Sequence, residues 1–347
     1  MSGGADSAFS AYLLRRAGHE VVALFALLAQ EEPEREVQRV QRLCTKLRIP
    51  LEVVDLRQAF QEKIIAYFKE AYQKALTPNP CVLCNREIKF GLLLQEALRR
   101  GAEKLATGHY VRLYFDSQKG CYFVKKGRDQ GKDQSYFLAL LGQEQLSRAL
   151  FPLGEWIKEE VIKETLKLGL FEITAPESQE VCFIRGDYRQ LFRDDAFPPG
   201  EIVTVSGRVV GKHRGLYAYT IGQRRGLGVR LGRPYYVVAL DPEKNQVVIG
   251  TKKHLARREV LVQKLHRVCP RLPWPEEAWV RIRYRHREAR AKLYPLGEEG
   301  LRLVFHTPQK AITPGQFAVI YQDDLVLGGG EIQRTKETCF EPDLEPS

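Results

Sequence analysis

The sequence predicts an α/β protein, with a parallel-sheet domain first and two β-rich units after it. Two observations predict this order. Apolar, β-branched runs alternate with helical patterns over the first half of the 347 residues, which is typical of a parallel sheet covered by helices. From about residue 200, short alternating runs between glycines and prolines indicate antiparallel strands. We expect domains at 1–195, 196–258 and 259–334, and a disordered tail at 335–347.

Each element follows from its local pattern. Strands of the first half are predicted where the runs are apolar and β-branched, at 20–28, 51–56 and 104–107. Helices are predicted where apolar residues recur at helical spacing, at 31–47, 60–76, 85–100 and 158–168. In the second half the alternating runs lie at 201–205, 235–240, 246–249, 279–292 and 301–305.

Composition and charge narrow the class of protein. The hydrophobic fraction of 44% is that of a globular chain, and no apolar run approaches the roughly 20 residues that cross a bilayer. We therefore expect a cytoplasmic protein with no membrane partner. A formal net charge of +11 favours a polyanionic partner. In a reducing compartment the seven cysteines are expected to be reactive or merely buried, not structural bridges.

A glycine loop opens the chain. Its residues, S-G-G-x-D-S after Met1, turn tightly and lead into an apolar-periodic helix, so backbone N–H groups and a helix N-terminus can bind an anion. The loop lacks the lysine of a G-x-x-x-x-G-K-[ST] motif. It resembles the pyrophosphatase (PP) loop of enzymes that split ATP between its α- and β-phosphates. A glycine turn that merely caps a helix is the alternative.

The position of this loop has a consequence for the fold. In nucleotide-binding α/β domains such a loop follows a buried parallel strand, yet Met1 already lies inside the motif. Loss of that strand would expose two sheet edges. We therefore expect the native protein to begin several residues upstream, with an apolar strand.

Cysteines mark two further stretches. Cys81 and Cys84 lie three apart after two prolines, at the expected start of a helix, where a thiol pKa is lowered. Half of a zinc site is the alternative, but no second ligand pair exists. Cys182 follows the polar run 176–181, which favours a loop over burial. The isolated Cys44, Cys121, Cys269 and Cys339 are expected to be dispensable for chemistry.

An arginine-rich run lies in the last β unit. If residues 280–285 form a strand, alternation places Arg281, Arg283 and Arg285 on one face. Three adjacent guanidinium groups repel one another unless an anion lies across them, which favours phosphate binding. A solvated face is the alternative.

These stretches together resemble the bacterial tRNA-specific 2-thiouridylases (the MnmA/TrmU family). The resemblance covers nearly the full length, in the same order. It is carried by S-G-G-A-D-S (2–7), T-P-N-P-C-V-L-C-N-R-E-I-K-F (77–90), A-T-G-H-Y (106–110), K-D-Q-S-Y-F-L (132–138), F-P-L-G (151–154), S-Q-E-V-C-F-I (178–184), Y-T-I-G-Q-R-R-G-L (219–227) and A-I-T-P-G-Q (311–316).

The resemblance implies a fold and a reaction. The fold is a PP-loop (adenine-nucleotide alpha-hydrolase-like) domain, a small β-rich domain and a C-terminal β-barrel that binds tRNA. The reaction is adenylation of the C2 oxygen of a wobble uridine in tRNA, followed by sulfur transfer from a cysteine persulfide. Cofactors and partners would be ATP with Mg²⁺, tRNA and a persulfide donor protein, such as a sulfur-relay protein or a cysteine desulfurase. No zinc or tightly bound cofactor is implied.

The resemblance also implies roles for single residues. Cys84 would be the nucleophile and Cys182 the persulfide carrier, and the two would form a transient disulfide. ATP would be bound by Met1, Ser2, Gly3, Gly4, Ala5, Asp6, Ser7, Ala26 and Gly108. The target base and tRNA would be contacted by Asn79, Pro80, Cys81, His109, Lys132, Asp133, Gln134, Arg283, Tyr284 and Gln316.

The chain departs from the family at two positions. Some relatives carry Asp where Cys81 stands, so the group that transfers protons is unassigned. Ala26 stands where some relatives place a methionine against the adenine. Two other functions remain open: another adenylating PP-loop synthetase, which would not need paired thiols, and a catalytically silent RNA-binding relative. Pyrophosphate exchange that depends on tRNA would separate them.

Overall fold

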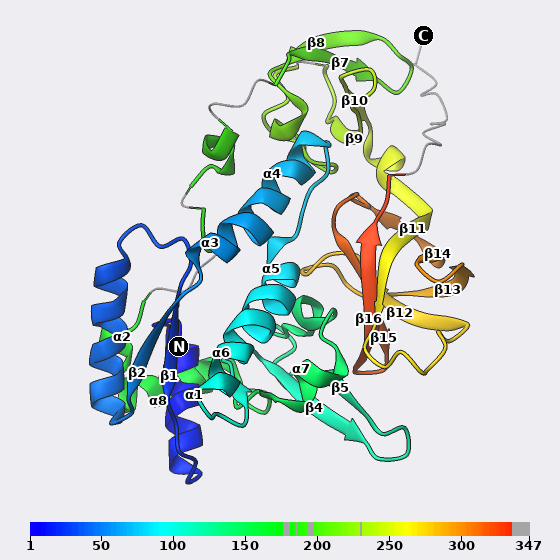
Figure 1. Cartoon of the computed structure of the whole chain (residues 1–347). Coiled ribbons are helices and arrows are strands. Elements are labelled where there is room, and N and C mark those ends of the chain that lie inside the picture. Colours follow the sequence, from blue (N-terminus) through cyan, green and yellow to red (C-terminus); the bar gives the residue numbers. More distant parts are fainter. Residues whose placement is uncertain (176–180, 185, 193–196, 230, 335–347) are drawn as a thin grey trace.

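The computed structural model describes residues 1–175, 181–184, 186–192, 197–229 and 231–334 (Figure 1). The tail expected at 335–347, Cys339, the boundary at 195/196 and the start of the 178–184 motif lie outside these residues. Within them, no helix is long and apolar enough to cross a membrane.

Helices and parallel strands alternate in the first part of the chain. Its first elements are α1 (Ala5–Arg16), β1 (Ala23–Leu27), α2 (Pro33–Leu47) and β2 (Leu51–Asp55). β1 pairs with β2 in parallel, and β3 (Leu105–Ala106) pairs in parallel with β6 (Ala149–Leu150). α1 and α2 pack on β1 through small and aliphatic side chains, Ala8, Ala11, Ala23, Val40 and Leu43 among them. The predicted parallel α/β arrangement is therefore confirmed, as two short sheets.

Two long helical columns follow β2 and cross the molecule (Figure 1). The first consists of α3 (Arg57–Phe60), η1 (Gln61–Ile65) and α4 (Ala66–Gln73), and the second of α5 (Pro80–Leu83), η2 (Cys84–Leu93) and α6 (Leu94–Arg99). η1 and η2 are π-helical. The side-chain amide of Gln145 donates to the carbonyl oxygens of Arg86 and Phe90, both at 2.9 Å, within η2. Gln145 therefore satisfies carbonyl groups in a segment that departs from the α-helical pattern.

The remaining helices are short, except for α8. They are η3 (Ser135–Leu138), α7 (Gln143–Ser147), α8 (Lys158–Lys167), η4 (Phe171–Ile173), η5 (Tyr188–Phe192), η6 (Leu216–Ala218) and η7 (Lys252–Leu255).

An antiparallel hairpin inside the first part was not predicted. β4 (Val111–Asp116) and β5 (Cys121–Lys126) pair with each other, and β5 also joins the C-terminal sheet through Lys125 and Leu325. A disulfide links Cys121 to Cys269, with 6.1 Å between their Cα atoms. The expectation that no cysteine forms a structural bridge is therefore wrong. The two residues are 148 positions apart and meet only because the hairpin packs against the barrel, which no local pattern reveals.

The middle part forms a four-stranded sheet in the order β8-β7-β10-β9. Its strands are β7 (Gly200–Thr204), β8 (Val209–His213), β9 (Tyr236–Asp241) and β10 (Gln246–Gly250). β7 pairs with β10 in parallel, so the sheet is not wholly antiparallel as expected. Its core contains Ile202, Val237, Val247 and Ile249.

The C-terminal part is a closed six-stranded barrel (Figure 1). Closure follows from the pairing of β11 with both β14 and β16. The strands are β11 (Ala256–Arg267), β12 (Glu277–Arg281), β13 (Ala289–Leu296), β14 (Gly300–Lys310), β15 (Phe317–Gln322) and β16 (Leu325–Ile332). The strand predicted over 279–292 is wrong, because β12 ends at Arg281 and the chain turns before β13.

Candidate active site

The glycine loop leads directly into α1. Gly3 has φ +81°, a conformation that favours glycine, and Gly4 is the N-cap of α1 without a side-chain hydrogen bond to the first turn. The hydroxyl of Ser7 donates to the Gly4 carbonyl at 2.9 Å. Because no side chain caps it, the first turn of α1 keeps backbone N–H groups and a positive dipole end for an anion.

Asp6 is held by two residues that the sequence did not single out for this role. The hydroxyl of Tyr110 donates to Asp6 Oδ1 at 2.7 Å, and Lys158 Nζ lies 2.7 and 2.9 Å from the two carboxylate oxygens. Lys158 is the first residue of α8, where the helix dipole disfavours a cation. That unfavourable position is the sequence signal that could have identified it.

Gly108 lies against the loop as expected for an ATP-binding residue. A Cβ atom at Gly108 would lie 2.9 Å from the backbone carbon of Asp6, so only glycine permits this approach. Close glycine backbone and an uncapped helix suit the phosphates of a nucleotide.

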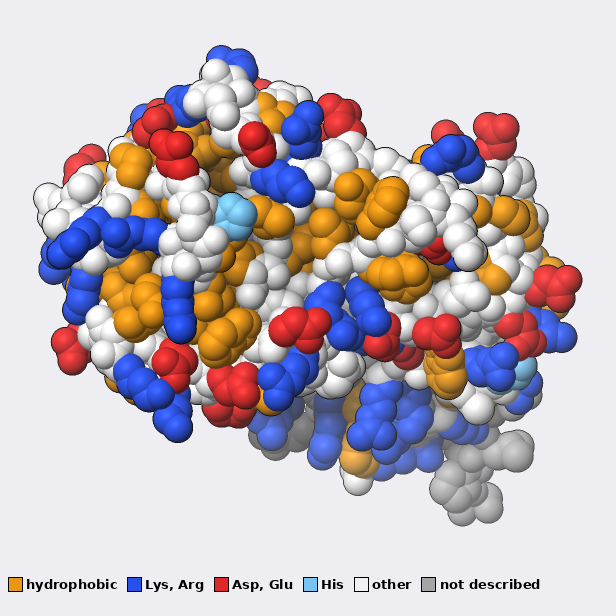
Figure 2. Space-filling view, turned by 90° about the horizontal axis from the view of Figure 1, so that it is seen from below, with side chains coloured by type: hydrophobic (Ala, Val, Ile, Leu, Met, Phe, Trp, Pro, Cys, Tyr) orange, Lys and Arg blue, Asp and Glu red, His pale blue; other side chains and the backbone are white. Residues whose placement is uncertain are grey.

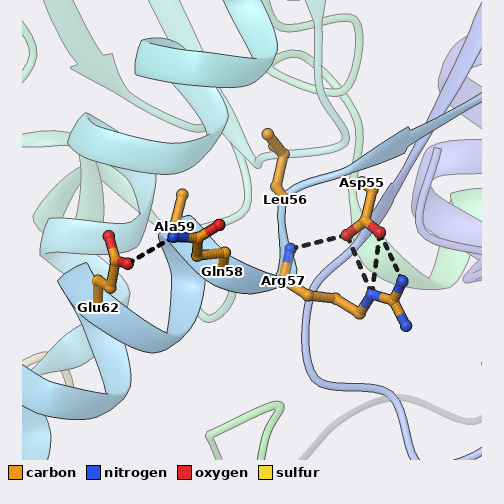
Figure 3. A pocket seen from close by; sticks show the side chains of 6 residues that line it. All are labelled: Asp55, Leu56, Arg57, Gln58, Ala59 and Glu62. Atoms are coloured by element: carbon orange, nitrogen blue, oxygen red, sulfur yellow. Dashed lines mark hydrogen bonds and ion pairs between the residues drawn. The ribbon is translucent and has the colours of Figure 1, made fainter.

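A pocket opens where β2 ends (Figure 3), at an edge of the sheet where ligands bind in α/β proteins. It is lined by Asp55, Leu56, Arg57, Gln58, Ala59 and Glu62. The Arg57 guanidinium lies 3.0 and 3.1 Å from the Asp55 carboxylate and holds the pKa of Asp55 down at about 2. Ala26 lies on the neighbouring strand β1, where its carbonyl accepts a 3.0 Å hydrogen bond from Gln30.

Three free thiols gather near this region. Cys84 is buried, Cys81 is partly exposed and Cys182 is exposed. Cys182 acts electrostatically on Cys81, and both Cys81 and Cys182 act on Cys84. Cys84 and Cys182 are not bonded to each other here, so their transient disulfide stays a prediction.

The protonation of these thiols differs from the expectation. Desolvation raises the pKa of Cys84 to about 12 and that of Cys81 to about 11, and it also raises the pKa of Cys182. The helix begins at Pro80, which places Cys81 in its first turn and Cys84 after it, but desolvation outweighs any helix-start effect at both thiols. The Lys89 ammonium opposes desolvation at all three thiols, and sequence reasoning missed this residue. The described residues contain no cluster of His, Cys, Asp and Glu suited to a metal.

His109 is buried near η2, the segment that carries Cys84. Its Nδ1 is 2.8 Å from the Thr107 hydroxyl, and its ring approaches Phe90 and Phe151. Burial, and then Lys89, hold its pKa well below the ordinary value, so His109 is neutral at pH 7.

Gln316 connects the barrel to the segment before the thiols. Its amide donates to the carbonyls of Thr77 and Pro78, at 2.8 and 3.2 Å. Asn79 follows as the N-cap of α5, and Pro80 is its buried first residue. The structure therefore brings three predicted base-contacting residues, Asn79, Pro80 and Gln316, to the thiols.

The three residues at 132–134 that were predicted to contact tRNA differ in how far they are buried. Lys132 and Gln134 are partly exposed, and Gln134 Oε1 accepts from the Tyr110 N–H at 3.0 Å. Asp133 is 3% exposed, and its carboxylate accepts from the Gly127 N–H and from Arg281, at 3.2 and 3.0 Å. Asp133 thus connects the first domain to the barrel.

The three arginines do not share one strand face. Arg281 is bound to Asp133 and Glu288 inside the protein, and Arg283 donates to Ile221 O and to Thr313. Phosphate is therefore not needed to balance Arg281. Arg285 is exposed in the turn after β12, and Tyr284 packs on Phe137 with 4.4 Å between ring centroids. In the view of Figure 2, a group of Lys and Arg side chains lies along the lower edge, and further ones are spread over the face among acidic side chains.

Comparison with known proteins identifies the family. Three family models match in order: a tRNA methyl transferase HUP domain over residues 1–186, a tRNA methyl transferase PRC-barrel domain over 192–251 and an aminomethyltransferase beta-barrel domain over 257–332. A protein of Moorella thermoacetica named tRNA-specific 2-thiouridylase MnmA is 45% identical, over 96% of this chain and 98% of its own. Relatives of the same name from Syntrophomonas wolfei and Syntrophotalea carbinolica are 46% and 44% identical, over 96% of this chain and 98% and 97% of theirs. The chain belongs to the tRNA-specific 2-thiouridylase (MnmA) family.

Proposed function

We propose that this chain is an ATP-dependent tRNA-uridine 2-sulfurtransferase. It adenylates the C2 oxygen of a wobble uridine in tRNA and replaces that oxygen with sulfur from a cysteine persulfide, giving 2-thiouridine, AMP and pyrophosphate. The observation that carries the proposal is the grouping of three free thiols with a phosphate-binding loop and a segment held by the barrel. The name of the relatives agrees with it.

Different residues of the chain bind the phosphates of ATP and the target base. The first turn of α1, with Gly3 and Gly108, holds the phosphates of ATP, and Mg²⁺ arrives with the phosphate oxygens. Bound ATP supplies the adenylyl group that makes the C2 oxygen a leaving group. Asn79, Pro80 and Gln316 hold the base near the thiols.

Sulfur transfer follows from the exposure of the two cysteines. Cys182 is exposed, so a donor protein can reach it and load a persulfide. Cys84 is buried, so it meets sulfur only through Cys182 and resolves the persulfide. We propose that tRNA and the donor protein meet the enzyme in the cytoplasm.

Single cysteine variants test these roles. The native chain, incubated with tRNA, ATP and a persulfide donor, should produce 2-thiouridine by nucleoside mass spectrometry. Cys182→Ser should still form AMP with tRNA but take up no sulfur, and Cys84→Ser should load Cys182 without passing sulfur on. Cys81→Ser, changed at the neighbouring thiol, shows whether Cys81 can replace Cys84. Full 2-thiouridine formation by Cys182→Ser would overturn the mechanism.

The same assay tests the two other functions. Tight tRNA binding without AMP formation by the native chain would favour a silent RNA-binding protein. AMP formation from ATP and a small acid or amide, independent of tRNA, would favour another synthetase. Either result would contradict the proposed sulfurtransferase.

A further inference from the structure

Lys89 lies on the same π-helical segment as Cys84, five residues later. The hydrogen bonds of a π-helix run between residues five apart, so the two positions lie about one turn from each other. Cys84 is 8% exposed, and Lys89 is partly buried next to Phe90, whose ring approaches His109. The ammonium group is therefore carried into the neighbourhood of the thiols by the helix itself.

The charge of Lys89 affects the pKa values of five groups. They are the amino group of Met1, the thiols of Cys81, Cys84 and Cys182, and the imidazole of His109. These groups come from α1's loop, the α5–η2 column, the segment after β3 and the segment that contains Cys182. Phe183, the residue after Cys182, packs against the buried cluster that contains Cys84 and Ile88, so the segment of Cys182 lies against the helix that carries Lys89.

No acid neutralises Lys89 within the part of the chain that the structure describes. Glu87, two residues earlier on η2, pairs instead with Arg86 at 2.7 Å and approaches Lys63 at 3.9 Å. His109 is neutral at pH 7, since burial lowers its pKa. A partly buried cation without a counter-ion is costly, and an anion in the site would offset this cost.

We propose that Lys89 is the counter-ion of the sulfur anions formed at Cys84 and Cys182, an inference that rests on the proposed sulfur transfer. Desolvation raises the pKa of both thiols, so without a cation little thiolate forms at neutral pH. Lys89 is the charged group that favours the thiolate at both positions. Its role is to stabilise and position the sulfur anion.

In the resolving step, one cation can balance the negative charge both before and after the thiolate attacks. The Cys84 thiol first loses its proton to solvent, and the thiolate attacks the inner sulfur of the Cys182 persulfide. The sulfur–sulfur bond breaks, its electron pair leaves with the outer sulfur as HS⁻, and a Cys84–Cys182 disulfide remains, which an external dithiol reduces. One negative charge passes from Cys84 to the departing sulfide, and Lys89 balances it before and after.

The test compares Lys89→Met with Lys89→Arg and with the control Lys63→Met, whose lysine is 47% exposed and lies one helical column away. The first measurement is the pH dependence of Cys182 alkylation by iodoacetamide in the full chain without ATP or tRNA. Lys89→Met should shift the profile to higher pH and slow alkylation at pH 8 roughly 3- to 10-fold, because fewer thiolates form. Lys89→Arg should restore most of the rate, and Lys63→Met should match the native chain.

The second measurement is sulfide release from chain loaded with persulfide at Cys182. Lys89→Met should slow the release at least tenfold, while its thermal unfolding stays close to native. Unchanged alkylation and sulfide release in Lys89→Met, or equal losses in Lys63→Met, would overturn the Lys89 proposal. Failure of the native chain to make 2-thiouridine would instead overturn the proposed function, because neither thiol measurement requires tRNA.

Discussion

At the scale of single residues, Gly108 determines how closely the chain after β3 approaches the phosphate loop. A Cβ atom there would lie 2.9 Å from the Asp6 backbone carbon and 3.1 Å from the Asp6 carbonyl oxygen. Both neighbours are backbone atoms at the start of α1, which cannot rotate away as a side chain can. Any larger residue must therefore move the loop itself.

We predict that Gly108→Ala weakens ATP binding. Overpacking of this kind costs about 1–3 kcal/mol, which corresponds to roughly 5- to 150-fold in affinity. Calorimetric titration with ATP measures the loss, and tRNA affinity should stay native. The matched control is Gly142→Ala, because the nearest atom to a Cβ there is 3.9 Å away, on His266. Native ATP affinity in Gly108→Ala would contradict this account of the loop.

The residues also show which site features could be predicted. The resemblance pointed to the loop, Cys84, Cys182 and Gln316 because each belongs to a motif with recognisable letters, and their roles stay predictions. It could not predict that Cys84 is hard to ionise, because desolvation depends on residues far away in the chain. The same holds for Arg281, whose partner Asp133 is brought to it by the fold.

At the scale of elements, the π-helical segment η2 carries Cys84 and Lys89 and depends on one glutamine. The two hydrogen bonds from Gln145 reach Arg86 O and Phe90 O from α7, a separate helix. A carbonyl oxygen has two lone pairs, so the Gln145 amide adds a hydrogen bond to groups that lie within the helix. Gln145 therefore stabilises the geometry that places the two site residues about one turn apart.

We predict that Gln145→Leu destabilises the protein and slows sulfur transfer. Loss of the amide removes two hydrogen bonds, at about 0.5–1.5 kcal/mol each in the free energy of unfolding. Urea titration measures this change, and the rate of 2-thiouridine formation should fall with it because Cys84 is displaced. Gln41→Leu, on the exposed side of α2, is the control and should leave both values native. Equal values for the two variants would count against a role for Gln145.

Elements with a strong local period were predicted well, and elements that depend on distant pairing were not. The helix expected at 31–47 is α2 (Pro33–Leu47), and the strand expected at 51–56 is β2 (Leu51–Asp55). The pairing of β5 with β16 could not be predicted, because Leu325 lies about 200 residues after Lys125. The run 279–292 was taken as one strand because alternation continues through the turn after Arg281, where the backbone no longer follows it.

At the scale of the whole molecule, the barrel and the first domain are joined by several buried connections. Lys126 on β5 lies 2.6 Å from Glu288, and Arg281 links Glu288 to Asp133 at 2.6 and 3.0 Å. Gln316 and the Cys121–Cys269 disulfide add two further connections. The barrel is therefore fixed relative to the thiols.

We predict that the Cys121–Cys269 disulfide stabilises the whole chain and is dispensable for chemistry. A bridge between residues 148 positions apart restricts the unfolded chain, and its removal costs roughly 3–5 kcal/mol. Cys121→Ala with Cys269→Ala should lower the free energy of unfolding by about this amount and retain sulfur transfer at moderate temperature. Dithiothreitol should destabilise the native chain similarly and leave the double variant unchanged. If both cysteines are alkylated when native chain is denatured without reductant, the bond is absent, and the remaining polar contacts alone hold the barrel in place.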